Sequence, residues 1–339
     1  MAKDLGIMLG FILRAVRQMQ LIRGLHNLSR FDADFVQGCV LTIGNFDGVH
    51  CGHQQVLRQL VQKSKKMGLP SVVMVFEPLP IEFFAPDKAP VRLMNLREKV
   101  QAFKCTGIDY VLVCRFDAAF AHLTAEAFIR QVLVAGLRVK QLVVGDDFQF
   151  GYQRQGDFTT LQLAGRSLGF EVSAMPTFGL VEVGVRRVSS TWVRQALAQM
   201  PPDLAMAERL LCRPFSFHGR VIHGRKLGRK IGFRTLNLNP KRHQMPVQGV
   251  FAVTVTGIAD RPWEGVANIG IRPTVKGNQP SIEVHLLNWQ KEVYGAHVEV
   301  FLQHFIRPEM KFGDLEDLVQ QIRQDVRKAK QFFNGKHYD

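Results

Sequence analysis

The chain has 339 residues, which is long for a single hydrophobic core and therefore predicts two domains. Its 46% hydrophobic and 22% charged residues are typical of a folded globular protein and argue against a disordered chain. Because 44 Lys and Arg outweigh 29 Asp and Glu, the net charge is +15, and we expect anionic partners: nucleotides, nucleic acid or a membrane surface.

Residues 1–18 form an extension ahead of Met19, with one apolar run of about ten residues that is too short to span a bilayer. It lacks the cleavage site of a signal peptide, and a membrane-surface helix is the alternative use. The five cysteines lie far apart, without a C-x-x-C pair or the spacing of a zinc site. We therefore expect reduced thiols in a cytoplasmic protein.

The region 19–200 alternates between two patterns. Strand-like apolar runs lie at 39–46, 71–76, 110–116 and 141–148, and amphipathic helical stretches lie at 52–67, 95–107, 124–136 and 190–199. This alternation predicts an α/β domain, a parallel sheet with helices on both faces. Ligands of such sheets bind at the carboxyl ends of the strands, so the loops after Phe46 and Phe148 are the informative ones.

Residues 201–213 are expected to be a linker with a short helix to about Leu211, and the region 214–339 to be a second domain. Its segments 215–224, 249–258, 263–270, 281–289 and 296–306 alternate in side-chain type and are separated by Gly, Pro and Asn. They predict a small antiparallel barrel or sandwich. From Asp314, a plausible N-cap, a helical stripe runs to Phe333 and predicts a closing helix.

The sequence "IGNFDGVHCGH", residues 43–53, carries the strongest chemical signal of the first domain. Its glycines let the backbone approach a ligand, and His50 and His53 stand at the start of a helix, where amides attract anions. Such a site suits nucleotidyl transfer, because fixed donors stabilise the charge that builds on the phosphates. The alternatives are a chance H-x-x-H spacing or half of a metal site.

Two further segments could belong to the same site. In "VSSTWVRQAL", residues 188–197, Ser190 or Thr191 would cap a helix and Arg194 follows one turn on, so hydroxyls, amides and a guanidinium could hold pyrophosphate oxygens. The loop 143–157 is rich in Gly, Asp and aromatic residues and could take a ring and a ribose. Ordinary helix capping and an ordinary acidic turn are the alternatives.

In the second domain, "GRKLGRKIGFRTLNL", residues 224–238, places a glycine at every fourth position, fills the gaps with cations and ends in Thr235 and Asn237. A helix-pairing face would need apolar surroundings, which the cations exclude. The remaining interpretations are a phosphate loop and a solvated basic loop.

These segments, together with "GVANIGIRPTV" and "EVHLL", occur in an order that resembles the bacterial bifunctional riboflavin kinase and FMN adenylyltransferase, or FAD synthetase, family from about Met19 to about Phe333. The resemblance implies a Rossmann-like nucleotidyltransferase domain followed by a kinase β-barrel with its closing helix. It also implies two reactions, in which riboflavin and ATP give FMN and ADP, and FMN and a second ATP give FAD and pyrophosphate, both with Mg²⁺. The implied partners are therefore riboflavin, FMN and ATP, without nucleic acid, membrane or a predicted oligomer, so that a monomer is expected.

The resemblance also assigns residues to roles. In the first domain it implies catalysis by His50 and His53, ATP binding by Gly44, Asn45, Phe46, Asp47, Gly48, Gly52, Ser190, Thr191 and Arg194, and flavin binding by Pro78, Asp147 and Phe148. In the kinase it implies ATP binding by Gly224, Gly228, Gly232, Thr235 and Asn237. Thr235 and Asn237 would also bind Mg²⁺, and Arg307 would lie beside the flavin. Glu283 corresponds to the catalytic base that takes the proton of the ribityl 5′-hydroxyl. Two positions depart from the family pattern: Leu79 replaces a polar residue, and Arg234 replaces a proline.

Two other functions are compatible with parts of the sequence. A basic protein with a small barrel could bind nucleic acid, but the cations of 225–230 are interleaved with glycines and not with aromatic residues. A different H-x-G-H transferase with an unrelated barrel is the other alternative. The presence of Thr235, Asn237 and Glu283 in the expected order argues against it.

Overall fold

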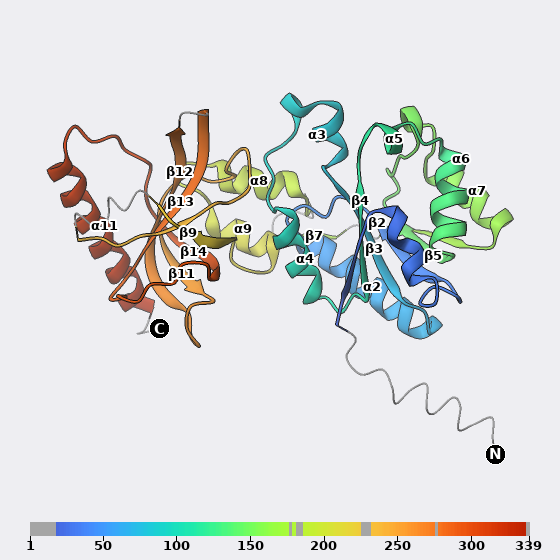
Figure 1. Ribbon diagram of the computed structural model, residues 1–339, viewed down its shortest axis with the longest axis horizontal. Helices are drawn as coiled ribbons and strands as arrows, with labels where there is room; N and C mark the ends of the chain where they lie inside the picture. Colours follow the sequence, from blue (N-terminus) through green and yellow to red (C-terminus); the bar gives the residue numbers. More distant parts are fainter. Residues whose placement is uncertain (1–17, 176–177, 181–185, 225–231, 275–276, 337–339) are drawn as a thin grey trace, which may run out of the picture. The chain divides into compact units, whose positions relative to one another are not determined.

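The computed structural model describes residues 18–175, 178–180, 186–224, 232–274 and 277–336, so the extension 1–17 and Gly228 lie outside the described residues. The chain forms two compact units (Figure 1). The first comprises Met1–Phe46, Gly52–Ala89 and Val100–Phe178, and the second comprises Asp47–Cys51, Pro90–Lys99 and Gly179–Asp339.

The first unit is built on a six-stranded sheet in which every neighbouring pair is parallel. Its strands, in spatial order, are β1 (Gln20–Arg23), β4 (Tyr110–Arg115), β3 (Ser71–Glu77), β2 (Cys39–Ile43), β5 (Val139–Val144) and β6 (Glu171–Ala174). All five residues of β2 are buried, as expected for a parallel strand that is covered on both faces and reads as a continuous apolar run. The predicted α/β class is confirmed, whereas the short edge strands β1 and β6 were missed.

The strand order reverses direction between β2 and β5, because the chain runs from β2 outward to β3 and β4 and then returns to the other side of β2. In open parallel sheets the ligand crevice lies outside the carboxyl ends of the strands at such a switch point. The loops that follow β2 and β5 are therefore the ones that the topology places at a ligand site, in agreement with the prediction from the sequence.

The predicted helices of this region are present with adjusted bounds. They are α2 (Cys51–Met67), α4 (Leu96–Lys104) and α6 (Ala125–Ala127), which continues into a π-helical segment, η3 (Phe128–Gly136). Helix α7 (Phe158–Leu168) was not predicted, although its ends carry clear signals. Asp157 caps its start by accepting from the backbone N–H of Thr160 at 2.7 Å, and Gly169 ends it in the left-handed conformation.

The second unit contains a closed antiparallel barrel, so the choice between barrel and sandwich is settled. Its strands, in spatial order, are β10 (Leu236–Leu238), β13 (Gly277–Leu286), β12 (Trp263–Thr274), β11 (Gly249–Thr256), β14 (His297–Arg307) and β9 (Ser216–Ile222). Five of these follow the predicted segments. The three-residue strand β10 was missed because it ends the glycine-rich stretch. Helices α8 (Ser190–Ala198) and α9 (Leu204–Leu211) precede the barrel in the chain.

The closing helix is α11 (Leu315–Lys336), and Asp314 caps it as predicted by accepting from the backbone N–H of Asp317 at 2.8 Å. Its apolar stripe packs on the barrel in one buried cluster, formed by Val250, Ala252, Val266, Leu287, Ala329 and Phe333. Burial of these side chains is the main stabilisation of the helix, because an isolated amphipathic helix is marginal in water.

The expectation of five reduced cysteines is wrong for two of them. Cys51 and Cys212, 161 residues apart in the chain, form a disulfide with their Cα atoms 5.6 Å apart. Sequence spacing could not show this pairing, because tertiary structure alone brings the two residues together. Cys39, Cys105 and Cys114 are free, and burial raises the pKa of the Cys39 and Cys114 thiols far above the usual range.

A buried carboxylate, that of Glu98, connects segment 90–99 with the barrel inside the second unit. It is 2% exposed, forms an ion pair with Arg242, and accepts from the backbone N–H groups of Asn95 at 2.7 Å and His218 at 2.9 Å. Arg242 in turn lies over the ring of Phe217. Removing one partner of such a pair leaves an uncompensated buried charge, which is strongly destabilising.

We predict that Glu98→Gln lowers the free energy of unfolding of the second unit by about 3 kcal/mol, because the guanidinium of Arg242 stays buried without its carboxylate. All three tryptophans (Trp192, Trp263 and Trp289) belong to this unit, so urea unfolding followed by tryptophan fluorescence measures it. Glu208→Gln is the control, since Glu208 is an exposed residue of the same unit and its substitution should change stability by less than about 0.5 kcal/mol. Equal midpoints for Glu98→Gln and wild type would contradict the prediction.

Candidate active sites on the two units

Three polar side chains stand in register across neighbouring strands of the barrel. Glu283 on β13 pairs with Asn237 on β10 on one side and with Asn268 on β12 on the other. Its strand neighbours Ile282 and Val284 are buried in the barrel core, so the carboxylate points to the outer face, as the strand alternation predicted. Directly paired residues hold their side chains within about 5.5 Å at Cβ. The barrel thus places a carboxylate between two amides.

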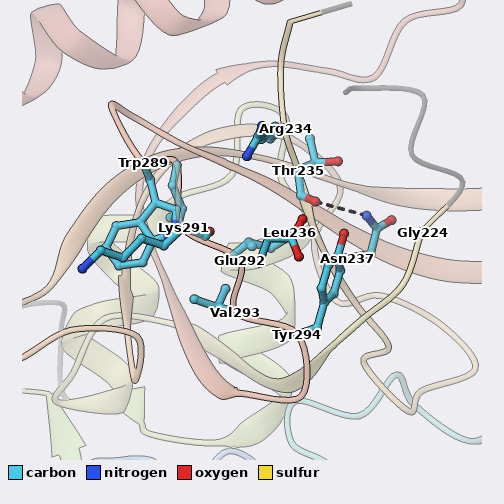
Figure 2. A pocket seen from close by; sticks show the side chains of 11 residues that line it. Gly224, Arg234, Thr235, Leu236, Asn237, Trp289, Lys291, Glu292, Val293 and Tyr294 are labelled. Atoms are coloured by element: carbon cyan, nitrogen blue, oxygen red, sulfur yellow. Dashed lines mark hydrogen bonds between the residues drawn. The ribbon is translucent and has the colours of Figure 1, made fainter. Parts of the chain in front are cut away.

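Gly224 lies against the side chain of Asn237 more closely than any other residue type could. A Cβ at position 224 would stand 2.4 Å from Nδ2 of Asn237, a distance that forces one of them to move. Asn237 Nδ2 also donates to the backbone carbonyl of Thr235 at 3.5 Å (Figure 2). The first glycine of the series is therefore required by its close contact with Asn237, which is one of the two predicted Mg²⁺ ligands.

Gly224, Thr235 and Asn237 line a pocket in the barrel unit. Its wall is formed by Gly224, Arg234, Thr235, Leu236, Asn237, Leu286, Trp289, Lys291, Glu292, Val293 and Tyr294 (Figure 2). Aromatic rings at its edge are held in place, because Tyr294 stacks on His223 with ring centroids 3.9 Å apart. Arg234, which replaces the family proline, donates from Nη1 to the carbonyl of Gln290 at 3.0 Å. Its cation thus belongs to the pocket wall.

Arg307 is anchored to the closing helix by an ion pair. Its Nε and Nη2 donate to the carboxylate of Asp325 on α11 at 2.8–3.1 Å, and that carboxylate is almost fully buried. Its neighbour Glu309 accepts from Asn268 at 3.3 Å. Partial burial, with Glu283 nearby, raises the pKa of Glu309. The segment after β14 therefore lies beside the strand residue that pairs with Glu283.

The described residues contain no cluster of three or more His, Cys, Asp or Glu side chains that could hold a metal ion on its own. The hydroxyl of Thr235 and the amide oxygen of Asn237 nevertheless suit Mg²⁺, which prefers few protein ligands and completes its shell with water and substrate phosphates. The residues present therefore fit a metal ion that arrives with a nucleotide.

The first unit contains a cavity of about 550 Å³ lined mainly by aromatic rings. Its ring-bearing wall consists of Phe76, Phe83, Phe84, Phe116, Phe120, His122, Phe128, Phe148, Phe150 and Tyr152, and Asn45 and Arg154 add polar groups. The rings pack on one another, with Phe148 and Phe150 stacked at 5.7 Å and His122 and Tyr152 at 5.2 Å. This size and lining suit a flat, largely apolar ring system.

Two of the residues assigned by resemblance to this region, Asn45 and Phe148, line the cavity, whereas Pro78 and Asp147 do not. Leu79 is buried, and its backbone N–H donates to the carboxylate of Glu82 at 2.9 Å. Most ring residues were missed as site residues. Tyr152 lies in the loop 143–157, which the sequence marks as a possible ring and ribose site. Phe83, Phe84, Phe116 and Phe120 are residues for which no site role was predicted.

Within the first unit, the loop after β2 leads to a tightly packed phenylalanine. Phe46 is 2% exposed, has a φ of 46° and packs on His53, with ring centroids 4.9 Å apart, and on Phe103. A Cβ on Gly44 would stand 3.1 Å from the Phe46 ring, so little more than a glycine fits there. A non-glycine residue in the left-handed region costs free energy and is found preferentially at functional sites.

In the second unit, Asp47 holds three chain segments together. Its carboxylate is 4% exposed, accepts from the backbone N–H groups of Leu93 and Met94 at 3.0 Å each, and forms an ion pair with Arg194 on α8. Arg194 Nε donates to the carbonyl of Val91 at 2.6 Å. Arg194, predicted to bind phosphate, is thus held in place by protein groups.

The predicted cap of α8 is off by one residue. Ser189 is the N-cap, and its hydroxyl accepts from the backbone N–H of Trp192 at 3.3 Å, whereas Ser190 and Thr191 are the first helical residues. The Ser190 hydroxyl instead donates to the carbonyl of Asp47 at 2.7 Å. Thr191 is exposed. The structure thereby brings Ser190, Arg194 and Asp47 together, as the resemblance implied.

His50 precedes α2 and is 6% exposed. Burial, reinforced by the cations of Arg187 and Arg213 and opposed by Asp47, lowers the pKa of His50 from 6.5 to about 4. At neutral pH the ring is therefore neutral, with a proton on one of its two nitrogens. It can donate a hydrogen bond to a phosphate oxygen but carries no positive charge of its own.

A parallel sheet with a ligand site at its switch point, joined in one chain to a barrel with a carboxylate beside Mg²⁺-type ligands, defines a transferase with two nucleotide-using domains. The family described as FAD synthetase matches residues 32–192, and the riboflavin kinase family matches residues 211–333. The chain belongs to the bifunctional riboflavin kinase/FMN adenylyltransferase family. It is thus a kinase and a nucleotidyltransferase, and the function predicted from the sequence is confirmed.

Relatives with that description cover nearly the whole chain. The protein of Escherichia coli (strain K12) is 53% identical over 93% of this chain and 98% of its own length. The protein of Haemophilus influenzae is 49% identical over 94% of this chain and 100% of its own length. A crystal structure described as a macrolide-efflux protein from Streptococcus pneumoniae has the same fold, with a TM-score of 0.72, 28% identity, and coverage of 92% of this chain and 99% of that one. In the part of the chain that the structure describes, no helix is long and apolar enough to cross a membrane.

We predict that the His50 ring titrates in the free protein with a midpoint near 4, because burial disfavours the imidazolium. Histidine proton resonances followed by NMR from about pH 8 down to about pH 3 measure it, and His50→Gln assigns the signal by removing it. As the pH falls from 6.5 toward 4, the unfolded chain takes up a proton here that the folded chain does not, so the folded state loses stability in that window. A midpoint near 6.5 would show that the ring is not held neutral.

We predict that Gly224→Ala slows riboflavin phosphorylation at least about tenfold, because the new methyl group displaces the side chain of Asn237. Adenylylation of supplied FMN should stay unchanged, which makes it the internal control. Gly335→Ala is the matched variant, since a Cβ there meets nothing within 4 Å. A fully active Gly224→Ala kinase would rule out a constrained position for Asn237.

Proposed function

We propose that Glu283 is the general base of the kinase step. Its carboxylate takes the proton of the ribityl 5′-hydroxyl while that oxygen attacks the γ-phosphorus of ATP, and ADP leaves. The observation that carries this proposal is the register of Glu283 between Asn237 and Asn268. A carboxylate there can reach a hydroxyl that lies next to phosphates held at Asn237.

We propose further that Thr235 and Asn237 bind Mg²⁺ together with the ATP phosphates, and that Gly224, Gly228 and Gly232 let the backbone approach the nucleotide. The metal supplies charge neutralisation for the phosphates when bound. Arg307 is assigned to the flavin end of this site. Its ion pair with buried Asp325 supports a positioning role, because it fixes the segment that carries Glu309.

In the adenylylation step, a phosphate oxygen of FMN attacks the α-phosphorus of ATP and pyrophosphate leaves. His50 and His53 donate hydrogen bonds to the phosphates, and the amides of Gly44, Asn45, Phe46, Asp47, Gly48 and Gly52 at the start of α2 add fixed donors. Ser190, Thr191 and Arg194 take the pyrophosphate end, with Asp47 orienting the guanidinium. The aromatic cavity receives the flavin ring, with Pro78, Asp147 and Phe148 assigned to its surroundings.

The domains follow the same division: residues 19–200 as the adenylyltransferase, 201–213 as a linker and 214–339 as the kinase. The partners are riboflavin, FMN and ATP, without nucleic acid or membrane, and the protein works as a cytoplasmic monomer. The net charge of +15 supports this choice, because all the phosphorylated partners are anionic.

The two sites should be separable by mutation. We predict that His53→Ala reduces conversion of FMN to FAD at least about a hundredfold while riboflavin phosphorylation continues, because only the adenylyl transfer loses a phosphate donor. Glu283→Gln should show the reverse. Purified protein incubated with riboflavin and Mg·ATP, followed by chromatographic separation of the flavins, measures both steps in one sample.

Loss of both activities in either variant, with the circular dichroism of the folded protein retained, would contradict the division into two sites. Absence of both FMN and FAD from the wild-type reaction would refute the proposed residues and reactions together.

A further inference from the structure

The disulfide of the second unit lies inside the adenylyltransferase motif. Cys51 is the second residue of His50-Cys51-Gly52-His53 and the first residue of α2, and it is 2% exposed. Its partner Cys212 follows the last residue of α9 and is exposed, with a left-handed φ of 55°. Cys212 is therefore the more accessible half of the disulfide, while Cys51 adjoins His50 in the chain.

The segment before Cys51 is also held by hydrogen bonds from the residue that follows Cys212. Arg213, the neighbour of Cys212, donates to the carbonyls of Gly48 at 2.7 Å and Val49 at 3.2 Å. Gly48 and Val49 both have positive φ values, 83° and 40°. These hydrogen bonds do not involve the sulfur atoms, so the disulfide is a second, separate restriction on the segment.

A hydrogen-bond acceptor also lies close to Cys51 for its reduced form. The Sγ atom of Cys51 lies 3.1 Å from the backbone carbonyl of Arg209 on α9, within reach for a thiol to donate a hydrogen bond. A buried Cys51 thiol would thus have an acceptor. The site accommodates both the dithiol and the disulfide.

We propose that Cys51 and Cys212 form a thiol–disulfide exchange site that turns FMN adenylylation off when it is oxidised; this inference rests on the proposed role of His50. The reacting partner is a small-molecule or protein disulfide, RSSR. The Cys212 thiolate attacks RSSR and releases one RS⁻, and the Cys51 thiolate then attacks the mixed disulfide at Cys212 and releases the second. Two protein thiols are oxidised and RSSR is reduced to two RSH. Disulfides in reducing compartments are commonly of this transient, sensing kind.

Oxidation lowers the rate because His50 has little freedom in the linked form. His50 is 6% exposed and adjoins Cys51, so we infer that a phosphate reaches the ring only when the segment around Cys51 shifts. A hydrogen bond from the Cys51 thiol to the Arg209 carbonyl can break during that shift, whereas a covalent bond to Cys212 cannot. A misplacement of about 1 Å is enough to cost a large factor in rate.

The test compares both activities in the same protein, with the thiol state measured directly. Full-length wild type is equilibrated with oxidised glutathione or with dithiothreitol, the thiol state is read by differential alkylation and mass spectrometry, and FMN-to-FAD and riboflavin-to-FMN rates are measured. We expect adenylylation to fall at least about tenfold on oxidation and to return with dithiothreitol, while riboflavin phosphorylation stays constant. The adenylylation rate of Cys212→Ser should be the same in both buffers. The rate of Cys51→Ser should likewise not change on addition of the oxidant.

Cys105→Ser is the matched control, because Cys105 is an exposed free cysteine outside the disulfide, and this variant should respond as wild type does. Equal adenylylation rates for the linked and the reduced protein would overturn the proposal, as would inhibition that persists in Cys212→Ser or failure of the disulfide to form. A reduced wild type that makes FMN but no FAD would instead refute the proposed adenylyltransferase role.

Discussion

The buried carboxylate of Asp47 organises the region on which the adenylyltransferase motif depends. A carboxylate that is 4% exposed must be neutralised and hydrogen-bonded, and Asp47 meets both needs with Arg194 and the backbone N–H groups of Leu93 and Met94. Three segments that are far apart in the chain therefore meet at one side chain. The Ser190 hydroxyl and Arg213 add bonds to the backbone of the same loop, at Asp47 and at Gly48 and Val49.

Asp47 and Arg194 consequently have a structural role in addition to the one that their motifs indicate. Asp47 and Arg194 belong to a phosphate-binding pattern, yet in the structure they satisfy each other and the backbone around them. Such an arrangement fixes the orientation of a guanidinium, and a fixed side chain loses less conformational entropy when it binds a ligand. His50 is affected by the same packing, because the burial that protects the ion pair also keeps its imidazole neutral.

In the barrel the controlling constraint is strand register. Asn237, Glu283 and Asn268 lie on three adjacent strands, and a slip of one residue would turn Glu283 into the core. Buried Ile282 and Val284 prevent that slip, so the hydrophobic alternation of β13 also sets the direction of the Glu283 carboxylate. The closing helix contributes through Asp325, which anchors Arg307 at the end of β14.

Much of the fold could be predicted, because strand and helix patterns depend on residues that are neighbours in the chain. The apolar runs at 39–46 and 71–76 predict strands of a parallel sheet, and the alternation in 281–289 predicts a strand with Glu283 on the face opposite to Ile282 and Val284. The aromatic cavity was only partly predictable: Phe148 lay in a marked loop, whereas Phe116 and Phe120 join it through packing alone. The one-residue error at the cap of α8 arose because two adjacent serines are equally good caps, and only the backbone conformation distinguishes them.

By itself the sequence determined the two-domain class, the parallel sheet, the antiparallel strands and the order of the motifs, since each depends on side-chain periodicity or on residues that are neighbours in the chain. Tertiary structure alone decided the pairing of Cys51 with Cys212, the partners of Asp47 and Glu98, and the lowered pKa of His50. The physical reason is that these properties depend on distances and on burial between residues far apart in the chain, about which local patterns carry no information.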